Sequence, residues 1–311
     1  MQDFKEHLSI IVPCFNEATN INEFYKRMIK VLNTLKIEKY KFIFVDDGSS
    51  DLTWEEIKKK NILDPLRVSG IKLTRNFGHQ HALLAGLDIA ESKYILTIDC
   101  DLQDPPEMLN EMYKVIVKKE FNIVSCQRRS RKDSFFKKIT AKIFYTIFNF
   151  FSNIKINSEV SDFKLFDNKV HKILKKFKEQ DPFIRGIISW PGYKEKKILF
   201  DRDKRYSGRS GWSLSKMFNF SLNAFFGFSS YPMRLSFILC IFLSIIFLIL
   251  VVYFLYWYIN GQNIKGWTSL VLIIVFFQIF NFFILGLISE YTGRIYFEVK
   301  DRPRYIIEKV L

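Results

Sequence analysis

Two long stretches near the end of the chain contain no charged residue, and they constrain the fold more than any other feature. They are Leu235–Tyr258 and Trp267–Ser289, and both are strongly apolar. Each is longer than the ~20 residues that a helix needs to cross a bilayer, and a buried helix of a soluble protein is seldom apolar on every side. Because the connection 259–266 is short, the sequence predicts a two-helix transmembrane hairpin over residues 235–289.

Basic residues flank this hairpin on its outer sides, whereas its loop contains only Lys265. The positive-inside rule therefore predicts a multi-pass membrane protein, with both termini and everything before Leu235 in the cytoplasm. The net charge of +15 and the aromatic content of 17% also favour a membrane surface or a polyanionic substrate. No zinc-finger, helix-turn-helix or RNA-binding signature accompanies the charge, so nucleic acid is not an expected partner.

Before the hairpin, short apolar runs alternate with amphipathic helical patterns. The runs predict strands over Leu8–Val12, Phe42–Val45, Val68–Leu73, Tyr94–Ile98 and Asn122–Gln127. Such alternation is typical of an α/β fold with a doubly wound, mostly parallel sheet. Neither a dinucleotide fingerprint nor a P-loop is present. One predicted helix, His79–Ala90, carries two histidines two residues apart, a spacing that does not make them a metal-binding pair.

The motif around which this domain is organised follows the fourth predicted strand and reads IDCDLQDPPE from Ile98 to Glu107. Asp99 and Asp101 come directly after a buried strand, and Pro105 and Pro106 stop that strand and begin a helix. Ligands of open α/β sheets bind at the carboxyl ends of strands, and paired carboxylates suit Mg²⁺ or Mn²⁺. Acidic decoration of a helix N-terminus is the alternative explanation.

Polar residues also follow the first two predicted strands, Asn16 and Glu17 after the first and Asp46 and Asp47 after the second. Parallel strands bring their carboxyl ends to one edge of a sheet, so these side chains are predicted to lie near Asp99. An acid at that edge can accept hydrogen bonds from a bound nucleotide. A capped turn is the alternative explanation for the second pair.

Two amphipathic segments, 135–151 and 214–228, interrupt the alternation. The first combines lysines with an apolar helical face, which fits a helix in the membrane interface as well as a helix that faces a core. The predicted organisation is an α/β domain over residues 1–212, a juxtamembrane interfacial helix over 213–234, the hairpin with spans 235–258 and 267–289, and a cytoplasmic C-terminal tail over 290–311.

An ordered set of motifs extends over nearly the whole chain. It comprises LSIIVPCFNE (8–17), FVDDGSSD (44–51), RNFGHQHALLAG (75–86), IDCDLQDPPE (98–107), SDFKLFD (161–167), FIRGIISWPG (183–192), RDKRYSGRS (202–210) and SEYTGRIYFEVKDRP (289–303). A lone Asp-x-Asp is weak, but this set resembles family-2 glycosyltransferases with the GT-A fold. More narrowly, it is similar to polyprenyl-phosphate hexosyltransferases, which include bactoprenol glucosyltransferases and bacterial relatives of dolichol-phosphate mannose synthase.

The resemblance implies roles at the matching positions. The metal on the donor diphosphate would be held by Asp99, Asp101 and Gln103. The nucleotide sugar would be contacted by Pro13, Asn16, Glu17, Asp46, Asp47, Asn76, Asp99 and Gln103. The reacting groups would be served by Asp162 near the sugar, by Arg128 and Arg131 at the acceptor phosphate, and by Arg202 and Arg205 on a mobile loop. Arginine forks suit phosphate oxygens, although a solvated basic run or lipid headgroup contact also explains Arg128 and Arg131.

The resemblance therefore implies an inverting, metal-dependent hexosyltransferase of the bacterial cytoplasmic membrane that uses a nucleotide sugar and a polyprenyl phosphate such as undecaprenyl phosphate. UDP-glucose is the expected donor, and mannosyl and N-acetylhexosaminyl donors stay open. A processive polysaccharide synthase is a second interpretation, but such synthases usually carry QxxRW, whereas here Gln180 and Arg185 are five apart and no Trp follows directly. A catalytically silent membrane scaffold is a third, and the intact acids argue against it. A homo-oligomer is compatible with the sequence.

Overall fold

The chain divides into two compact units in a computed structural model, which describes residues 6–129, 160–180, 182–201, 241–246, 248–250, 252–253, 255–256, 259–260 and 266–311. The first unit contains the described residues up to 201 together with residues 303–311. The second contains the described residues from 241 to 302. The predicted interfacial segments 135–151 and 213–234 lie outside the described residues, as does part of the first predicted span, 235–258.

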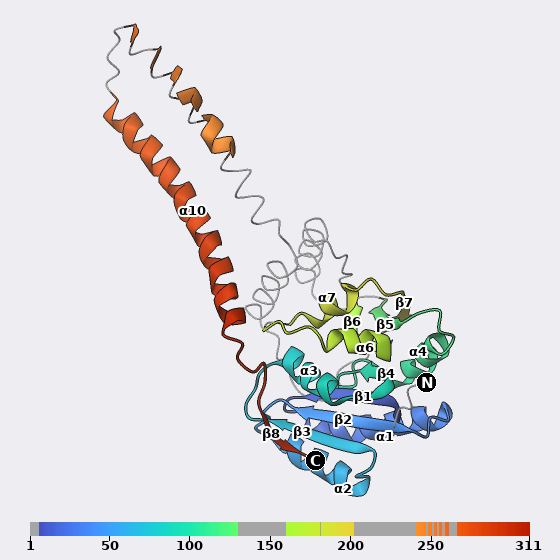
Figure 1. Ribbon diagram of the computed structural model, residues 1–311. Coiled ribbons are helices and arrows are strands. Elements are labelled where there is room, and N and C mark those ends of the chain that lie inside the picture. Colours follow the sequence, from blue (N-terminus) through green and yellow to red (C-terminus); the bar gives the residue numbers. More distant parts are fainter. Residues whose placement is uncertain are drawn as a thin grey trace. The chain divides into compact units, whose positions relative to one another are not determined.

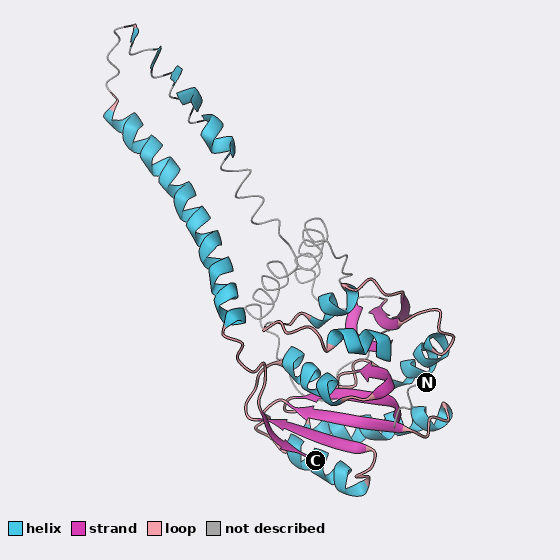
Figure 2. Ribbon diagram, in the orientation of Figure 1, coloured by secondary structure: helices cyan, strands magenta, loops and turns pink. Residues whose placement is uncertain are grey.

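An eight-stranded sheet forms the centre of the first unit (Figures 1 and 2), and its strand order is β7-β5-β6-β4-β1-β2-β3-β8. The strands are β1 (Glu6–Cys14), β2 (Tyr40–Asp46), β3 (Val68–Leu73), β4 (Ser92–Thr97), β5 (Ile123–Arg128), β6 (Val160–Asp167), β7 (Glu195–Phe200) and β8 (Ile307–Val310). The helices of this unit are α1 (Ala18–Thr34), α2 (Thr53–Leu63), α3 (His79–Ile89), η1 (Pro106–Met108), α4 (Leu109–Ile116), α6 (Asn168–Leu174) and α7 (Ile184–Ser189).

The sheet is mixed, because four of its seven strand pairings are parallel and three are antiparallel. Strands β3, β2, β1 and β4 are parallel neighbours, as the alternation predicts. However, β6 lies between β4 and β5 and runs antiparallel to both. The strand that follows β4 in the chain, β5, is therefore separated from β4 by β6. As a consequence, the start of β6 lies at the same sheet edge as the end of β4.

Helices cover both faces of the sheet, so the doubly wound character is confirmed (Figure 1). On one face the apolar side of α1, with Phe24 and Met28, packs in a buried core with Ile10 of β1. On the other face α3 lies so close to β1 that a Cβ on Gly86 would be 2.3 Å from the Ile11 side chain. Because both faces are covered, the central strands read as continuous apolar runs.

The end of the chain returns to the first unit as the edge strand β8, which pairs antiparallel with β3. The sequence predicted only a tail over residues 290–311. Tyr305 donates its hydroxyl to Asp88 of α3 (2.6 Å), and the Arg304 guanidinium donates to the backbone carbonyl of Phe177 (3.0 Å). Residues 304–311 are therefore fastened to α3 and to the sheet edge.

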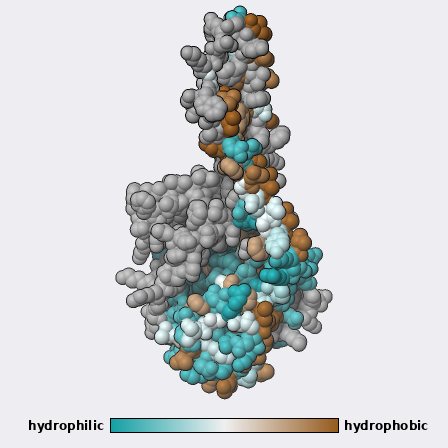
Figure 3. Space-filling view, turned by 90° about the vertical axis from the view of Figure 1, so that its left-hand side faces the viewer, coloured by the Kyte–Doolittle hydropathy of each residue, from teal (hydrophilic) through white to brown (hydrophobic). Residues whose placement is uncertain are grey.

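The second unit contains α10 (Trp267–Val299), which includes the second predicted span. Large apolar side chains of this helix are exposed and appear as brown surface in Figure 3. They include Ile274, Phe276, Ile279, Phe282, Leu285 and Ile288. Among the residues that the structure describes, no helix combines the length and apolarity that membrane crossing requires.

Candidate active site

The loops after β1 and β2 hold each other at the carboxyl edge of the sheet. Asn16, whose φ is +56°, accepts a hydrogen bond at Oδ1 from the backbone N–H of Ser50 (2.9 Å). Its own backbone N–H donates to Ser49 Oγ (2.9 Å), and the N–H of Glu17 donates to Thr53 Oγ1 (2.8 Å). Asn16 and Glu17 lie at the predicted edge, and these contacts fix the backbone that leads into α1.

Asp47 holds a third loop, the one between β3 and α3. Its two carboxylate oxygens accept hydrogen bonds from the backbone N–H groups of Phe77 (2.7 Å) and Gly78 (2.9 Å). Burial raises the pKa of Asp47, and these two donors partly offset that rise. The neighbouring Gly48, with φ +66°, crosses this loop so closely that a Cβ would lie 2.4 Å from the carbonyl carbon of Arg75. Three strand-end loops are thus locked together.

Asp46 has one satisfied and one open carboxylate oxygen. Its Oδ1 accepts from the backbone N–H of Ser49 (3.0 Å), which is the capped turn that the sequence allowed. Its Oδ2 is buried and has no hydrogen-bond partner within the described part of the chain. Burial raises the pKa of this carboxyl group. Since a buried polar atom without a partner is costly, Oδ2 is suited to accept an N–H from a ligand.

Asp99 and Asp101 follow β4 at the same edge, as predicted. Asp101 is almost fully buried, and its Oδ1 accepts from the backbone N–H of Gln103 (3.0 Å). Leu102, between Asp101 and Gln103, has φ +60°, so this short loop turns sharply enough to bring Gln103 back toward Asp101. Within the described residues, no group of three or more His, Cys, Asp and Glu side chains could hold a metal ion.

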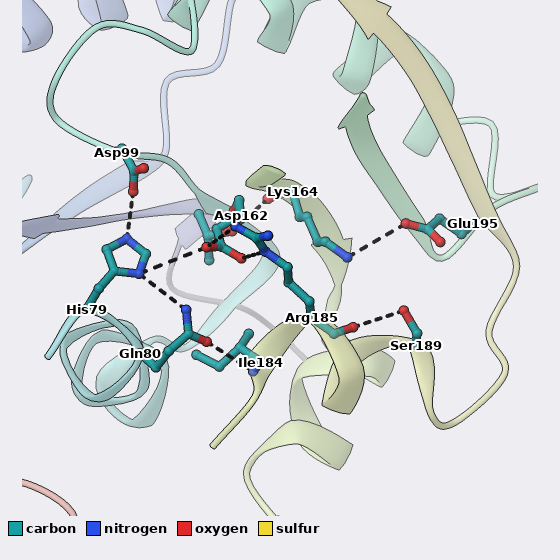
Figure 4. A network of polar contacts seen from close by, with 10 residues as sticks. His79, Gln80, Asp99, Asp162, Lys164, Ile184, Arg185, Ser189 and Glu195 are labelled. Carbon is teal, nitrogen blue, oxygen red and sulfur yellow. Dashed lines mark hydrogen bonds and ion pairs between the residues drawn. The ribbon is translucent and has the colours of Figure 1, made fainter. Parts of the chain in front are cut away.

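Asp162, near the start of β6, forms a two-pronged ion pair with Arg185 of α7 (Figure 4). The guanidinium Nε and Nη2 donate to the two carboxylate oxygens at 2.8 and 3.0 Å. Burial alone would raise the pKa of Asp162, but Arg185, followed by the nearby His79, holds that pKa well below its usual range. Asp162 is therefore an ionised group with both oxygens engaged, and it is a weak base.

His79, the first residue of α3, lies between the two acidic centres (Figure 4). Its Nε2 donates to Asp99 Oδ1 (2.8 Å), and its Nδ1 is 4.0 Å from Asp162 Oδ2. Burial alone would lower the pKa of His79, but the Asp99 carboxylate and then Asp162 outweigh it and raise that pKa to about 9. Gln80 and Ile184 complete the group, because the Ile184 N–H donates to Gln80 Oε1 (3.0 Å) while the Gln80 amide faces His79 Nδ1 (3.3 Å).

Of the other predicted site residues, the structure describes some and not others. Pro13 pairs in register with Val45 inside the sheet, and Asn76 lies in the β3–α3 loop. Arg128 ends β5, in register with Phe200 at the end of β7, so its backbone lies at the same edge. The remaining predicted arginines lie outside the described residues, and they are Arg131, Arg202 and Arg205.

Sequence reasoning missed His79 and Arg185 as members of this group. The lone arginine of the apolar run FIRGIIS was the available signal, because a cation inside such a run needs an acidic partner. The conclusion that the two histidines of α3 do not act as a pair agrees with the geometry. His81 Nε2 lies 3.0 Å from the backbone carbonyl of Gln180, whereas His79 faces Asp99.

The sequence profile described as Glycosyl transferase family 2 matches residues 9–179, which include the strand-end acids and Asp162. The chain belongs to glycosyltransferase family 2. An uncharacterized glycosyltransferase of Bacillus subtilis, YkcC, is 40% identical over 97% of this chain and 93% of its own length. The bactoprenol glucosyl transferase of Shigella phage SfII is 35% identical over 97% of each chain.

The fold agrees with that of a solved glycosyltransferase, the glucosyl-3-phosphoglycerate synthase of Mycobacterium tuberculosis in complex with Mg²⁺ and uridine diphosphate. The two structures superpose with a TM-score of 0.51 at 14% identity, covering 70% of this chain and 76% of the other. Both comparisons support the GT-A expectation.

This glycosyltransferase therefore has four acidic side chains at one edge of its sheet, and they differ in their hydrogen-bond partners. Asp46 keeps an open oxygen, and Asp99 and Asp101 place two further carboxylates directly after β4. Asp162 stays ionised through its pair with Arg185, and both of its oxygens are engaged. The arrangement suits the binding of a charged sugar donor and the stabilisation of charge that develops during transfer.

Proposed function

We propose that this glycosyltransferase transfers one hexose from a nucleotide sugar to a polyprenyl phosphate, with inversion at the anomeric carbon. The convergence of Asp46, Asp99, Asp101 and Asp162 at one sheet edge carries the proposal. The acceptor is inferred from relatives named bactoprenol glucosyl transferase, which align over almost the whole of both chains. The same names favour glucose, and UDP-glucose is the first donor to test.

Asp46 supports the nucleotide part of this proposal. The open Oδ2 can accept the imide N–H of a uracil ring, and the bound base would remove the cost of an unpartnered buried oxygen. The interlocked loops of Asn16, Asp47 and Gly48 hold the strand end of Asp46 in place. A rigid strand end lowers the entropy that is lost when the nucleotide binds.

Asp99, Asp101 and Gln103 fit a divalent cation that is shared with the donor diphosphate. Two carboxylates are too few for a closed protein site, and Mg²⁺ and Mn²⁺ are commonly bound by one or two carboxylates together with substrate phosphates. When bound, such a cation offsets the charge on the leaving diphosphate. The turn at Leu102 and the Gln103 N–H restrict the motion of the Asp101 carboxylate.

The acceptor needs no strong protein base. A phosphate monoester has a second pKa near ~6, so it is largely dianionic at neutral pH. A phosphate oxygen forms the new bond to the anomeric carbon, the bond to the nucleoside diphosphate breaks, and its electron pair leaves with the diphosphate. Asp162, ionised through its pair with Arg185, orients the sugar and stabilises the positive charge that grows at the anomeric carbon.

We also propose the membrane hairpin over residues 235–289, with the catalytic unit and both termini in the cytoplasm. The exposed apolar side chains of α10 support it, because a surface of that kind marks a membrane or protein contact. The test uses a protein variant from which the native cysteines have been removed. In intact cells, Gln262→Cys in this variant should react with an impermeant thiol reagent, and Ser207→Cys should not. The opposite pattern would place the catalytic unit outside the cytoplasm.

A donor panel tests the reaction itself. Detergent-purified protein is incubated with undecaprenyl phosphate, Mn²⁺ and one radiolabelled donor at a time, either UDP-glucose, UDP-N-acetylglucosamine or GDP-mannose. We expect one labelled lipid product carrying a single sugar, formed from UDP-glucose. A ladder of longer products would favour a polysaccharide synthase, and no labelled lipid from any donor would refute the proposal.

A further inference from the structure

A directed series of hydrogen bonds connects α7 to the predicted metal-binding carboxylate (Figure 4). The backbone N–H of Ile184 donates to Gln80 Oε1 (3.0 Å), and this turns the amide nitrogen of Gln80 toward His79 Nδ1 (3.3 Å). The opposite ring nitrogen, Nε2, donates to Asp99 Oδ1 (2.8 Å). The imidazole plane is therefore set from one side and aimed at Asp99 on the other.

We propose that His79 is a positioning residue for the cation-binding carboxylate Asp99, and that Gln80 fixes the orientation of its ring. The inference rests on the proposed metal-dependent function and assigns a role to residues beyond the acidic pair. Nε2 donates to Asp99 in both the neutral tautomer that carries its proton there and the imidazolium, so this contact does not depend on the charge of the ring. The Gln80 amide donates to Nδ1 only in the neutral tautomer. The contact holds Oδ1 of Asp99.

The location of His79 explains why such support is needed. Asp99 lies just beyond the last residue of β4, Thr97, so the strand ladder does not fix its side chain. Partners that hydrogen-bond to a ligating carboxylate orient it, and their loss typically lowers metal affinity or activity by about 10- to 100-fold. His79 is the first residue of α3, whose body packs tightly on β1, so the ring has a rigid base.

The test measures binding of Mn²⁺ to the full-length protein in the presence of UDP, with electron paramagnetic resonance as the detection method. We expect His79→Ala to weaken Mn²⁺ binding about 10- to 100-fold. His79→Gln, which retains an N–H donor of similar reach, should recover part of that loss, and Gln80→Leu should produce a smaller weakening. His81→Ala is the matched control on the same helix, since His81 contacts a backbone carbonyl, and it should bind Mn²⁺ like the wild type.

The outcomes separate the inference from the proposed function. Wild-type protein that binds no Mn²⁺ with UDP would overturn metal dependence and this inference together. Unchanged or tighter Mn²⁺ binding in His79→Ala would overturn the inference alone, since tighter binding would mean that the ring only competes with the cation. A cooperative thermal unfolding transition, together with UDP binding in EDTA that matches the wild type, verifies that each variant is folded with its nucleotide site intact.

Discussion

The buried fork between Asp162 and Arg185 should dominate the stability of the acidic edge. Their side chains are only 11% and 20% exposed, so Arg185→Met leaves a carboxylate unpaired in a poorly solvated place. Loss of one partner of a buried pair costs about 3–5 kcal/mol. His79 and Lys164 offer partial compensation nearby, so we expect about 2–3 kcal/mol here. In thermal unfolding of purified protein, that loss lowers Tm by roughly 5–10 °C.

A second fork in the same unit provides the control. Arg27 donates from Nε and Nη2 to the two oxygens of Glu107, but that carboxylate is 51% exposed. Double-mutant cycles should therefore give a coupling of about 2–3 kcal/mol for Arg185→Met with Asp162→Asn. The same cycle for Arg27→Met with Glu107→Gln should give less than about 1 kcal/mol.

The pH dependence gives an independent check on the charge of Asp162. Its pKa in the folded state lies below that in the unfolded state, so the pair contributes its stabilisation fully above about pH 4 and loses it as the pH falls further. The difference in Tm between wild type and Arg185→Met should therefore be constant from pH 5.5 to 8. Equal couplings in the two forks, or a difference that vanishes at neutral pH, would refute the reasoning that Asp162 is ionised and cannot be the base.

Three further results are expected. Asp99→Asn and Asp101→Asn should each reduce the transfer rate by at least ~100-fold, and EDTA should do the same to the native protein, whereas full activity in EDTA would exclude the metal. Asp46→Asn should raise the KM for the donor without lowering Tm. Asp47→Asn should lower Tm, because the Asp47 carboxylate accepts two backbone N–H groups and so holds the loop before α3. An equal loss of Tm in both variants would contradict this difference. Burial lowers the pKa of His171, so its contribution is present above about pH 6.5 and is lost on acidification, and His171→Gln should show a smaller drop in Tm between pH 7.5 and 5.5 than the wild type.

The sequence predicted those parts of the fold that are determined locally. β1 to β4 and the helices between them are specified by apolar runs, amphipathic spacing and turn residues within about 30 residues of chain, and they occur as predicted. β8 was missed because it has four residues, all exposed, and two of these are charged. Its strand character comes from pairing with β3, more than two hundred residues earlier in the chain, and no local pattern records that pairing.

The same distinction applies to the site. Asp46, Asp99 and Asp101 were predicted from their positions after strands, because parallel strands place their carboxyl ends at one edge of the sheet. Asp162 was named only through the family resemblance. Their cationic partners could not be found in this way. His79 precedes Asp99 by 20 residues and Arg185 follows Asp162 by 23, and both reach their partners only after α3 and α7 have packed against the sheet. The antiparallel insertion of β6 brings Asp162 to this edge, and alternation alone did not predict it.

Some carboxylate oxygens at this sheet edge accept hydrogen bonds from the protein, and Oδ2 of Asp46 is left without a partner by the described residues. The first kind holds the loops in place, and the second kind is suited to bind a ligand. Asp47 and Asp162 have both oxygens engaged by groups of the protein, so their removal should act mainly on structure and on the local field. Asp46 has an oxygen that the described residues leave open, and burial makes that oxygen costly until a ligand donates to it. Neither charge nor position distinguishes these carboxylates, since each is an acid near the end or the start of a strand. Their hydrogen-bond partners decide which acid shapes the site and which acid binds the substrate.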